Sequence, residues 1–332
     1  MNLKEIGEFG FIRMVRDHFP TRNSSIVQGI GDDAAVLRTT PGSVNLITTD
    51  LLIEDVHFKR TCISMEHLGH KSLAVNLSDI AAMGGTPICA VISLAIPGDE
   101  NVDSLLDFYH GMGTLAHTYH VELVGGDTSI SYHGLNVSIT VLGEADPEHV
   151  LYRHTARVGD SIYVTGYLGD SAYGLGITVH KWDLPSQLRD YFYTAHNLPR
   201  PYVSEGQFLA KSEMAHAMID LSDGLSSDLG HICEESKVGA RIYEQLIPFS
   251  MPLREVAMND QVNSLSLALH GGEDYCLLVT GLPELEYYYK ESLGKPLYRI
   301  GEIVSEPGMV LVDCAGKGNP LKPGGYDHFI MN

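Results

Sequence analysis

Apolar and polar residues repeat with two different periods along the first 145 residues. Apolar positions spaced three to four residues apart predict helices at 7–19, 66–84 and 104–120. Shorter runs of apolar and β-branched residues predict strands at 43–50, 86–96, 121–129 and 135–145. Predicted strands and helices therefore alternate, which is typical of a mixed α/β domain.

A polar stretch rich in turn residues, 145–161, interrupts this pattern, and we place a domain boundary near residue 150. The second half begins with a glycine-rich segment at 162–177, and residues 214–236 are predicted to form a strand that turns into a helix. We therefore expect two domains, residues 1–148 and residues 149–332, and a fold of class α/β or α+β.

The composition excludes some classes of partner. With 22 basic and 42 acidic side chains, the 332-residue chain carries a formal charge of −20, which repels nucleic acid and anionic membranes. The five cysteines are far apart and form no C-x-x-C pair, which favours a reduced compartment. The first residues lack the apolar core of a signal peptide, and the longest apolar run, 88–96, is too short to cross a bilayer. We expect a cytoplasmic protein.

Acidic residues recur where an apolar run meets a glycine or hydroxyl turn. The motifs are GIGDD at 29–33, TTD at 48–50, GGD at 125–127, IDLSDG at 219–224 and GGED at 271–274. A further carboxylate, Asp79, lies in the helix predicted at 66–84. Clustered carboxylates repel one another, and Mg²⁺ binds carboxylate and phosphate oxygens. We therefore expect folding to gather these groups into a magnesium site for a phosphate ligand.

The first motif also matches a dinucleotide-binding fingerprint, since Gly29 to Ala34 reads G-x-G-x-x-A. That fold needs a long helix after the glycines, and Pro41 leaves room for barely two turns. Asp32 and Asp33 would also repel a pyrophosphate, by roughly 4 kcal/mol per charge pair at about 4 Å and a dielectric constant of about 20. A bridging cation turns this repulsion into attraction, so we favour metal-mediated phosphate binding.

Two other segments have competing interpretations. Asp223 precedes a predicted helix and is either its N-cap or a metal ligand. Residues 165–176, TGYLGDSAYGLG, are either a backbone cradle for phosphate or a tight turn between a strand and a helix. The P-loop and protein-kinase motifs are absent from the sequence, so binding of ATP would require another architecture.

Nine segments, taken together and in order, resemble the thiamine-monophosphate kinases, relatives of aminoimidazole ribonucleotide synthetase and selenophosphate synthetase. They are GEFGFI, GIGDDAAV, TTDLLIEDVHF, KSLAVNLSDIAAMGG, GGDTS, VTGYLGDSAYGL, IDLSDGLSSDLGHI, GGEDY and GYDHF. The resemblance implies an N-terminal α/β domain whose strands form a barrel across a homodimer, and a C-terminal α+β domain. It also implies transfer of the γ-phosphate of ATP to thiamine monophosphate, with several Mg²⁺ ions taking part.

Matched motif by motif, the resemblance implies three sets of site residues. The metal ligands would be Asp32, Asp33, Thr48, Thr49, Asp50, Asp79, Asp127, Asp220 and Asp223. The ATP contacts would be Tyr109, Gly126, Asp127, Arg153 and Ser222. The thiamine end would meet His57, Glu273 and Tyr326.

The chemistry of this reaction agrees with an acidic site. The acceptor is already a phosphate oxyanion, so the enzyme has to align two anions and neutralise their charge rather than supply a base. Two doubly charged phosphates at about 4 Å repel by on the order of 16 kcal/mol at a dielectric constant of about 20, which only multiple cations offset. From a different class, a non-catalytic nucleotide or metal sensor would keep the same acidic pocket without turnover.

Overall fold

The computed structural model describes residues 3–31, 34–180, 184–260 and 262–325. The chain separates into two compact units, one of residues 1–80 and 85–148 and the other of residues 81–84 and 149–332. Both units combine helices and sheets, which confirms the predicted mixed α/β class. Among the described residues, no helix is long and apolar enough to cross a membrane.

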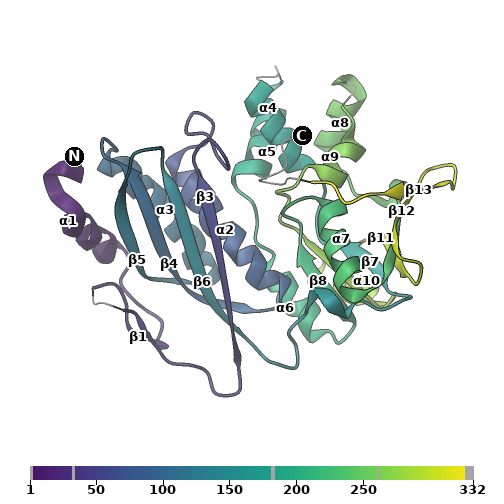
Figure 1. Ribbon diagram of the computed structural model, residues 1–332, viewed down its shortest axis with the longest axis horizontal. Coiled ribbons are helices and arrows are strands. Elements are labelled where there is room, and N and C mark those ends of the chain that lie inside the picture. The colour runs from purple at the N-terminus through teal and green to yellow at the C-terminus, as the bar shows by residue number, and fades with distance from the viewer. Residues whose placement is uncertain (1–2, 32–33, 181–183, 261, 326–332) are drawn as a thin grey trace. The chain divides into compact units, whose positions relative to one another are not determined.

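The first unit is built on a four-stranded sheet of order β3-β6-β4-β5 (Figure 1). Its elements are α1 (Leu3–His18), β1 (Ile26–Gln28), β2 (Val36–Leu37), β3 (Val44–Ile53), α2 (Met65–Ala82), β4 (Thr86–Pro97), α3 (Val102–Tyr119), β5 (Glu122–Ser131) and β6 (Asn136–Ala145). The strands and helices predicted from periodicity in this half are confirmed. The prediction at 7–19 misses the start of α1, which begins at Leu3 and contains Gly7 with non-helical angles of φ 66° and ψ 172°.

The segment after the first glycine motif is not a nucleotide-binding βαβ unit. After β1, the next described element is β2, which pairs with β1 in antiparallel orientation. Both strands are short, and no helix is assigned between them among the described residues. The rejection of the dinucleotide fingerprint is therefore confirmed.

Helices α2 and α3 cover one face of the four-stranded sheet (Figure 1). Two glycines let the helices approach closely, because a Cβ on Gly69 would lie 1.8 Å from the Phe108 carbonyl oxygen and one on Gly111 would lie 1.8 Å from that of Glu66. Buried Leu68, Leu73 and Leu77 extend this core from α2. Each such leucine contributes about 1.5–3 kcal/mol through burial of its side chain.

The other face of this sheet remains partly exposed. On β3, Leu46 and Leu52 are buried, whereas Ile47 is 71% and Leu51 is 51% exposed. Because successive side chains of a strand point to opposite faces, this alternation separates a helix-covered face from an open one. The β1–β2 segment covers one corner of the open face, where Ile26 packs with Cys89 and Val124.

The second unit contains a seven-stranded sheet of order β13-β12-β9-β11-β7-β10-β8. All of its neighbouring strands are antiparallel except β9 and β12. Its strands are β7 (Ser161–Val164), β8 (Ala215–Asp220), β9 (Gly239–Tyr243), β10 (Leu277–Gly281), β11 (Tyr298–Val304), β12 (Gly308–Val312) and β13 (Gly318–Leu321). Its helices are η1 (Arg153–Thr155), α4 (Asp170–His180), α5 (Ser186–Asn197), α6 (Val203–Lys211), α7 (Leu225–Ser236), η2 (Glu244–Leu246), α8 (Met251–Asp260), α9 (Ser264–His270) and α10 (Leu285–Leu293). The strand and helix predicted within 214–236 are β8 and α7.

Candidate active site

A pocket of about 800 Å³ opens at the β5 edge of the first unit. It is lined by α1, by residues on either side of the GIGDD motif, by β4 and by the GGD motif of β5. Three predicted ATP contacts, Tyr109, Gly126 and Asp127, line this pocket. Asp127 is exposed, so a ligand in the pocket can reach its carboxylate.

Gly126 is a position that tolerates no side chain. A Cβ at this residue would lie 1.9 Å from the backbone oxygen of Ile92 on the neighbouring strand. The glycine therefore allows β4 and β5 to approach closely and leaves backbone exposed at the pocket wall.

The same pocket is lined by two arginines, which the sequence analysis did not single out. Arg13 and Arg16 lie on α1, three residues apart and so on one face of the helix, and both are exposed. A Cβ on Gly31 would lie 3.6 Å from the Arg16 side chain, which places this guanidinium beside the GIGDD motif. The pocket wall therefore carries both positive charge and the carboxylate of Asp127.

Tyr109 is buried in an aromatic cluster at the end of the pocket. Its ring lies 5.9 Å from that of Phe11, 6.0 Å from that of Phe19 and 5.6 Å from that of Phe108, measured between centroids. Burial raises the pKa of its hydroxyl. The phenol therefore stays neutral, and the ring presents an apolar wall to a ligand.

Thr48, Asp50 and Asp79 come together between β3 and α2. The Thr48 hydroxyl donates a short hydrogen bond to an Asp79 carboxylate oxygen. Burial, and then the negative charge of Asp79, raise the pKa of Asp50 to about 7. Two carboxylates that repel each other beside a hydroxyl oxygen form a donor set that suits a hard divalent cation.

The register of the sheet separates Asp127 from this group. Asp50 pairs with Ile139, which pairs with Ile92, in a row on the helix-covered face. The next row contains Leu51, Ser138, Ser93 and Asp127, and exposed Leu51 marks it as belonging to the open face. Thr49 also lies on the open face, where its hydroxyl oxygen accepts a hydrogen bond of 3.0 Å from Thr140. Asp50 and Asp127 thus point to opposite sides of the sheet.

His57 lies in the turn that follows β3. Its Nδ1 atom accepts a hydrogen bond of 2.9 Å from the backbone N–H of Ile53. An Nδ1 atom that accepts carries no hydrogen, so the Nε2 atom is the protonated nitrogen of the neutral ring. This fixes the ring orientation of the predicted substrate contact.

The IDLSDG motif joins β8 to α7 in the second unit. Asp220 is buried at the end of β8. The N-cap position of α7 is Gly224, so the interpretation of Asp223 as the N-cap is wrong. An Asp228 carboxylate oxygen accepts the N–H groups of Asp223 and Gly224 at 3.2 and 3.1 Å.

Asp228 adds a carboxylate that the sequence analysis did not select. Burial, and then the charges of Asp220 and Asp223, raise its pKa to about 8. The sequence signal for it is weak, because its position four residues after a glycine is common in any first helical turn. Its contacts show that it shapes the loop that presents Asp223.

The GGED loop packs against both the IDLSDG motif and the start of α4. Glu273 donates its N–H to the Ser222 carbonyl oxygen at 2.7 Å. Asp274 accepts the N–H groups of Gly169 at 2.8 Å and Ser171 at 3.4 Å. Residues 165–169 therefore form the turn between β7 and α4, and residues 170–176 belong to α4 itself. A carboxylate of the protein takes the N–H groups that a phosphate cradle would use.

The remaining predicted residues are placed as follows. Arg153 begins η1 and its side chain is exposed, while its carbonyl oxygen accepts a hydrogen bond of 2.8 Å from Ser236. Asp32, Asp33 and Tyr326 lie outside the described residues. Within the described part of the chain, no three His, Cys, Asp or Glu side chains gather into a group that could hold a metal ion.

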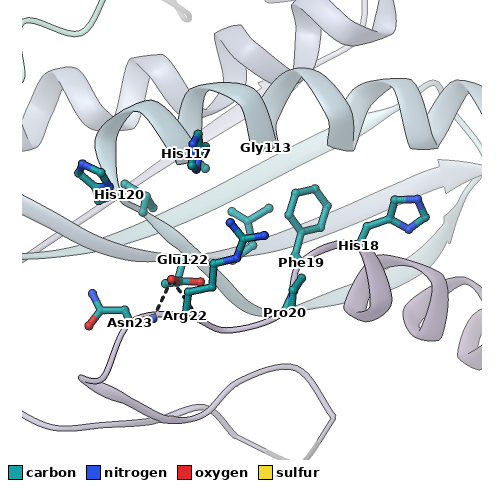
Figure 2. A pocket seen from close by; sticks show the side chains of 12 residues that line it. His18, Phe19, Pro20, Arg22, Asn23, Gly113, His117, His120 and Glu122 are labelled. Atoms are coloured by element: carbon teal, nitrogen blue, oxygen red, sulfur yellow. Dashed lines mark hydrogen bonds between the residues drawn. The ribbon is translucent and has the colours of Figure 1, made fainter.

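A second pocket, of about 500 Å³, lies between the end of α1 and the end of α3 (Figure 2). Figure 2 shows His18, His117 and His120 at its rim, with Arg22 beside Glu122. A Glu122 carboxylate oxygen accepts the backbone N–H groups of Arg22 and Asn23 at 3.1 and 2.9 Å. This carboxylate thus fixes the chain between α1 and β1, next to the larger pocket.

Comparison with known proteins gives a consistent match over both halves of the chain. Residues 31–145 match the family described as AIR synthase related protein, N-terminal domain, and residues 157–314 match its C-terminal domain. The thiamine-monophosphate kinase of Bacillus subtilis (strain 168) is 37% identical over 313 residues, which cover 92% of this chain and 95% of the relative.

Solved structures extend this similarity to the fold. The crystal structure of thiamine-monophosphate kinase from Stenotrophomonas maltophilia K279a is 34% identical, with a TM-score of 0.83, and covers 95% of this chain and 98% of its own. The structure of AaThiL complexed with AMPPCP and TMP is 33% identical, with a TM-score of 0.78, and covers 99% of both chains.

Proposed function

The chain belongs to the thiamine-monophosphate kinase family, and we propose that it transfers the γ-phosphate of ATP to the phosphate of thiamine monophosphate, giving thiamine diphosphate and ADP. One observation carries this proposal: the chain matches, over 99% of its length, a structure complexed with AMPPCP and TMP. AMPPCP is an ATP analogue whose β- and γ-phosphates are joined by carbon, so that complex pairs a nucleotide with a phosphate acceptor.

We assign the pocket at the β5 edge to the triphosphate. Gly126 leaves backbone exposed at its wall, and Arg13 and Arg16 add two positive charges. Guanidinium groups contact phosphate oxygens in a planar, bidentate geometry, which orients the group as well as attracting it. Tyr109 closes one end with a neutral ring and excludes water from that side.

Mg²⁺ fits the donor sets of this chain, and Asp50, Asp79 and Thr48 would hold one ion. The observation behind this assignment is the meeting of these groups between β3 and α2, where the Thr48 hydroxyl donates to Asp79 and where burial and the charge of Asp79 raise the pKa of Asp50. When bound, Mg²⁺ neutralises phosphate charge during transfer. Asp127 on the open face and Asp220 and Asp223 in the second unit would serve as further carboxylate ligands.

The contribution of the protein to the reaction is to position the two substrates. The acceptor phosphate is already an oxyanion, so no side chain has to remove a proton from it. The chain must hold donor and acceptor in line, and well-oriented reactants gain roughly 7–11 kcal/mol over free encounter. We propose that His57, Glu273 and Tyr326 bind the thiamine end, and that Arg153 and Ser222 contact the nucleotide.

We further propose that a second copy of the chain covers the open face of the four-stranded sheet. Exposed Ile47, Leu51 and Val91 lie on the open face of β3 and β4. Contiguous exposed apolar side chains on a sheet mark an interface, because burial of that surface stabilises association. A barrel formed by the sheets of two copies would bury these residues.

Product analysis tests the proposed function directly. The protein is incubated with ATP, thiamine monophosphate and Mg²⁺, and thiamine diphosphate is separated chromatographically and quantified by its fluorescent thiochrome derivative. We expect thiamine diphosphate and ADP in equal amounts, and neither product with AMPPCP in place of ATP. ATP binding without thiamine diphosphate would instead support a nucleotide sensor, and ADP alone would support a hydrolase.

A further inference from the structure

We infer that the buried side chain of His196 positions the Glu273 carboxylate for the positively charged thiazolium end of the substrate. This inference rests on the proposed function, because it needs thiamine monophosphate as the ligand. It adds a positioning residue from α5, a helix that contributes none of the motifs in the sequence analysis.

The GGED loop has an unusual backbone. Glu273 and Tyr275 have φ values of 57° and 49°, and Gly272, the second glycine of the motif, has 68°. Non-glycine residues in this region are strained, and such strain is retained where surrounding contacts enforce it. Here the Glu273 N–H donates to Ser222 and the Tyr275 N–H donates to the Leu221 carbonyl oxygen at 2.8 Å. The main chain of Glu273 is therefore held in one conformation.

The side chain of Glu273 contacts the imidazole of His196. Its Oε2 atom lies 3.1 Å from Nδ1 of His196, and the two side chains are 28% and 8% exposed. An ionised carboxylate can only accept hydrogen bonds, so this contact requires His196 Nδ1 to carry the hydrogen. The Ser171 hydroxyl oxygen lies 3.0 Å from the same nitrogen, so with Nδ1 protonated it acts as a second acceptor for that hydrogen.

The packing of α4 against α5 fixes His196 itself. Gly174 of α4 faces α5 so closely that a Cβ there would lie 2.2 Å from the Phe192 carbonyl oxygen and 3.0 Å from the His196 Cβ. The Tyr173 and Phe192 rings pack beside this contact with centroids 4.5 Å apart. The packing of α4 against α5 thus fixes the position of the imidazole, while the Glu273 carboxylate remains partly accessible to solvent.

The chemistry of a thiazolium ring explains why such an arrangement is useful. Its quaternary nitrogen has a positive charge and no N–H group, so the protein must recognise it by a negative charge at a fixed place rather than by a hydrogen bond. The Nδ1–H group of His196 orients the carboxylate through a hydrogen bond. Binding improves because the carboxylate is ordered before the ligand arrives.

Steady-state kinetics of four variants test the inference. In His196→Ala we expect the KM for thiamine monophosphate to rise about tenfold, with kcat and the KM for ATP within about twofold of wild type. His196→Asn keeps a donor close to the Nδ1 position and should recover most of this loss. Glu273→Gln should raise the same KM, and His196→Ala/Glu273→Gln should be no worse than about twofold above Glu273→Gln, because both changes act on one interaction.

The outcomes separate this inference from the proposed function. Wild-type protein that forms no thiamine diphosphate overturns the function itself. Active wild type with an unchanged KM for thiamine monophosphate in folded His196→Ala overturns the positioning role, as does an additive double variant. If His196→Ala does not melt cooperatively, Ser171→Ala and His196→Asn provide the comparison. A KM for thiamine monophosphate equal to wild type in His196→Asn, together with a raised KM in Ser171→Ala, supports the inference. Equal changes in the KM for thiamine monophosphate and in the KM for ATP contradict it.

Discussion

Asp274 connects the GGED loop to the start of α4, and its removal should change how stability depends on pH. Burial raises the pKa of this carboxyl from 3.8 to about 7, against the N–H groups of Gly169 and Ser171, whose hydrogen bonds lower it. The variant Asp274→Asn keeps an oxygen that accepts the Gly169 N–H and removes the titrating group.

The magnitude follows from linkage. Between pH 3.8 and about 7 the folded state holds a proton on Asp274 that the unfolded state has released, so the free energy of unfolding falls as pH rises through this window. At about 1.4 kcal/mol per pH unit, the whole window corresponds to on the order of 4 kcal/mol. Between pH 5 and pH 8, wild type should therefore lose about 2.5 kcal/mol more than Asp274→Asn.

Urea unfolding followed by circular dichroism at pH 5, 6, 7 and 8 measures this difference. Asp190→Asn, an exposed carboxylate on α5, is the matched control and should follow wild type at each pH. If Asp274→Asn loses as much stability as wild type between pH 5 and pH 8, to within about 0.5 kcal/mol, the carboxyl does not titrate in this window and the reasoning is refuted.

Three further changes probe other parts of the chain. Asp127→Asn should lower kcat/KM at least about a hundredfold with an unchanged melting temperature, because this exposed carboxylate lies in the nucleotide pocket. The control Asp99→Asn, at another exposed carboxylate, should retain full turnover. Wild-type turnover in Asp127→Asn would remove this residue from the site. Gly69→Ala should reduce the free energy of unfolding by about 1–3 kcal/mol, since its Cβ would meet the Phe108 oxygen. Gly230→Ala, whose Cβ would lie 3.2 Å from Pro323, should reduce the free energy of unfolding by less. An equal reduction in the two variants would contradict the close α2–α3 packing. Ile47→Glu should convert a dimer to a monomer, measured by size-exclusion chromatography with light scattering, whereas Val158→Glu should leave the dimer intact. A monomeric wild type, or a dimer that persists in Ile47→Glu, would disprove the proposed interface.

The elements of the first unit follow from local patterns in the sequence. Helices α2 and α3 and strands β3 to β6 lie where the apolar periods place them, because backbone geometry sets the period at which side chains return to the same face. The rejection of a dinucleotide fold also needed only local information, since a proline stands where a long helix would have to run.

Contacts between distant segments could not be read from local patterns. Arg13 and Arg16 join the Asp127 pocket only because the fold brings α1 to the β5 edge of the sheet, and isolated arginines on a helix look like ordinary surface charge. His196 likewise gains its role from Glu273, which lies 77 positions away in the chain.

The sequence alone determined which carboxylates follow an apolar run beside a glycine or hydroxyl residue, because these are local signals. In the structure Asp220 ends β8, whereas Asp50 and Asp127 lie inside β3 and β5 rather than at strand ends. The tertiary structure decided which of these carboxylates share a side. Asp50 and Asp79 meet between β3 and α2, whereas Asp127 lies on the other face of the same sheet, because side chains alternate along a strand and the pairing register sets each row. A shift of the register by one residue would exchange those faces, and no property of a single segment specifies that choice.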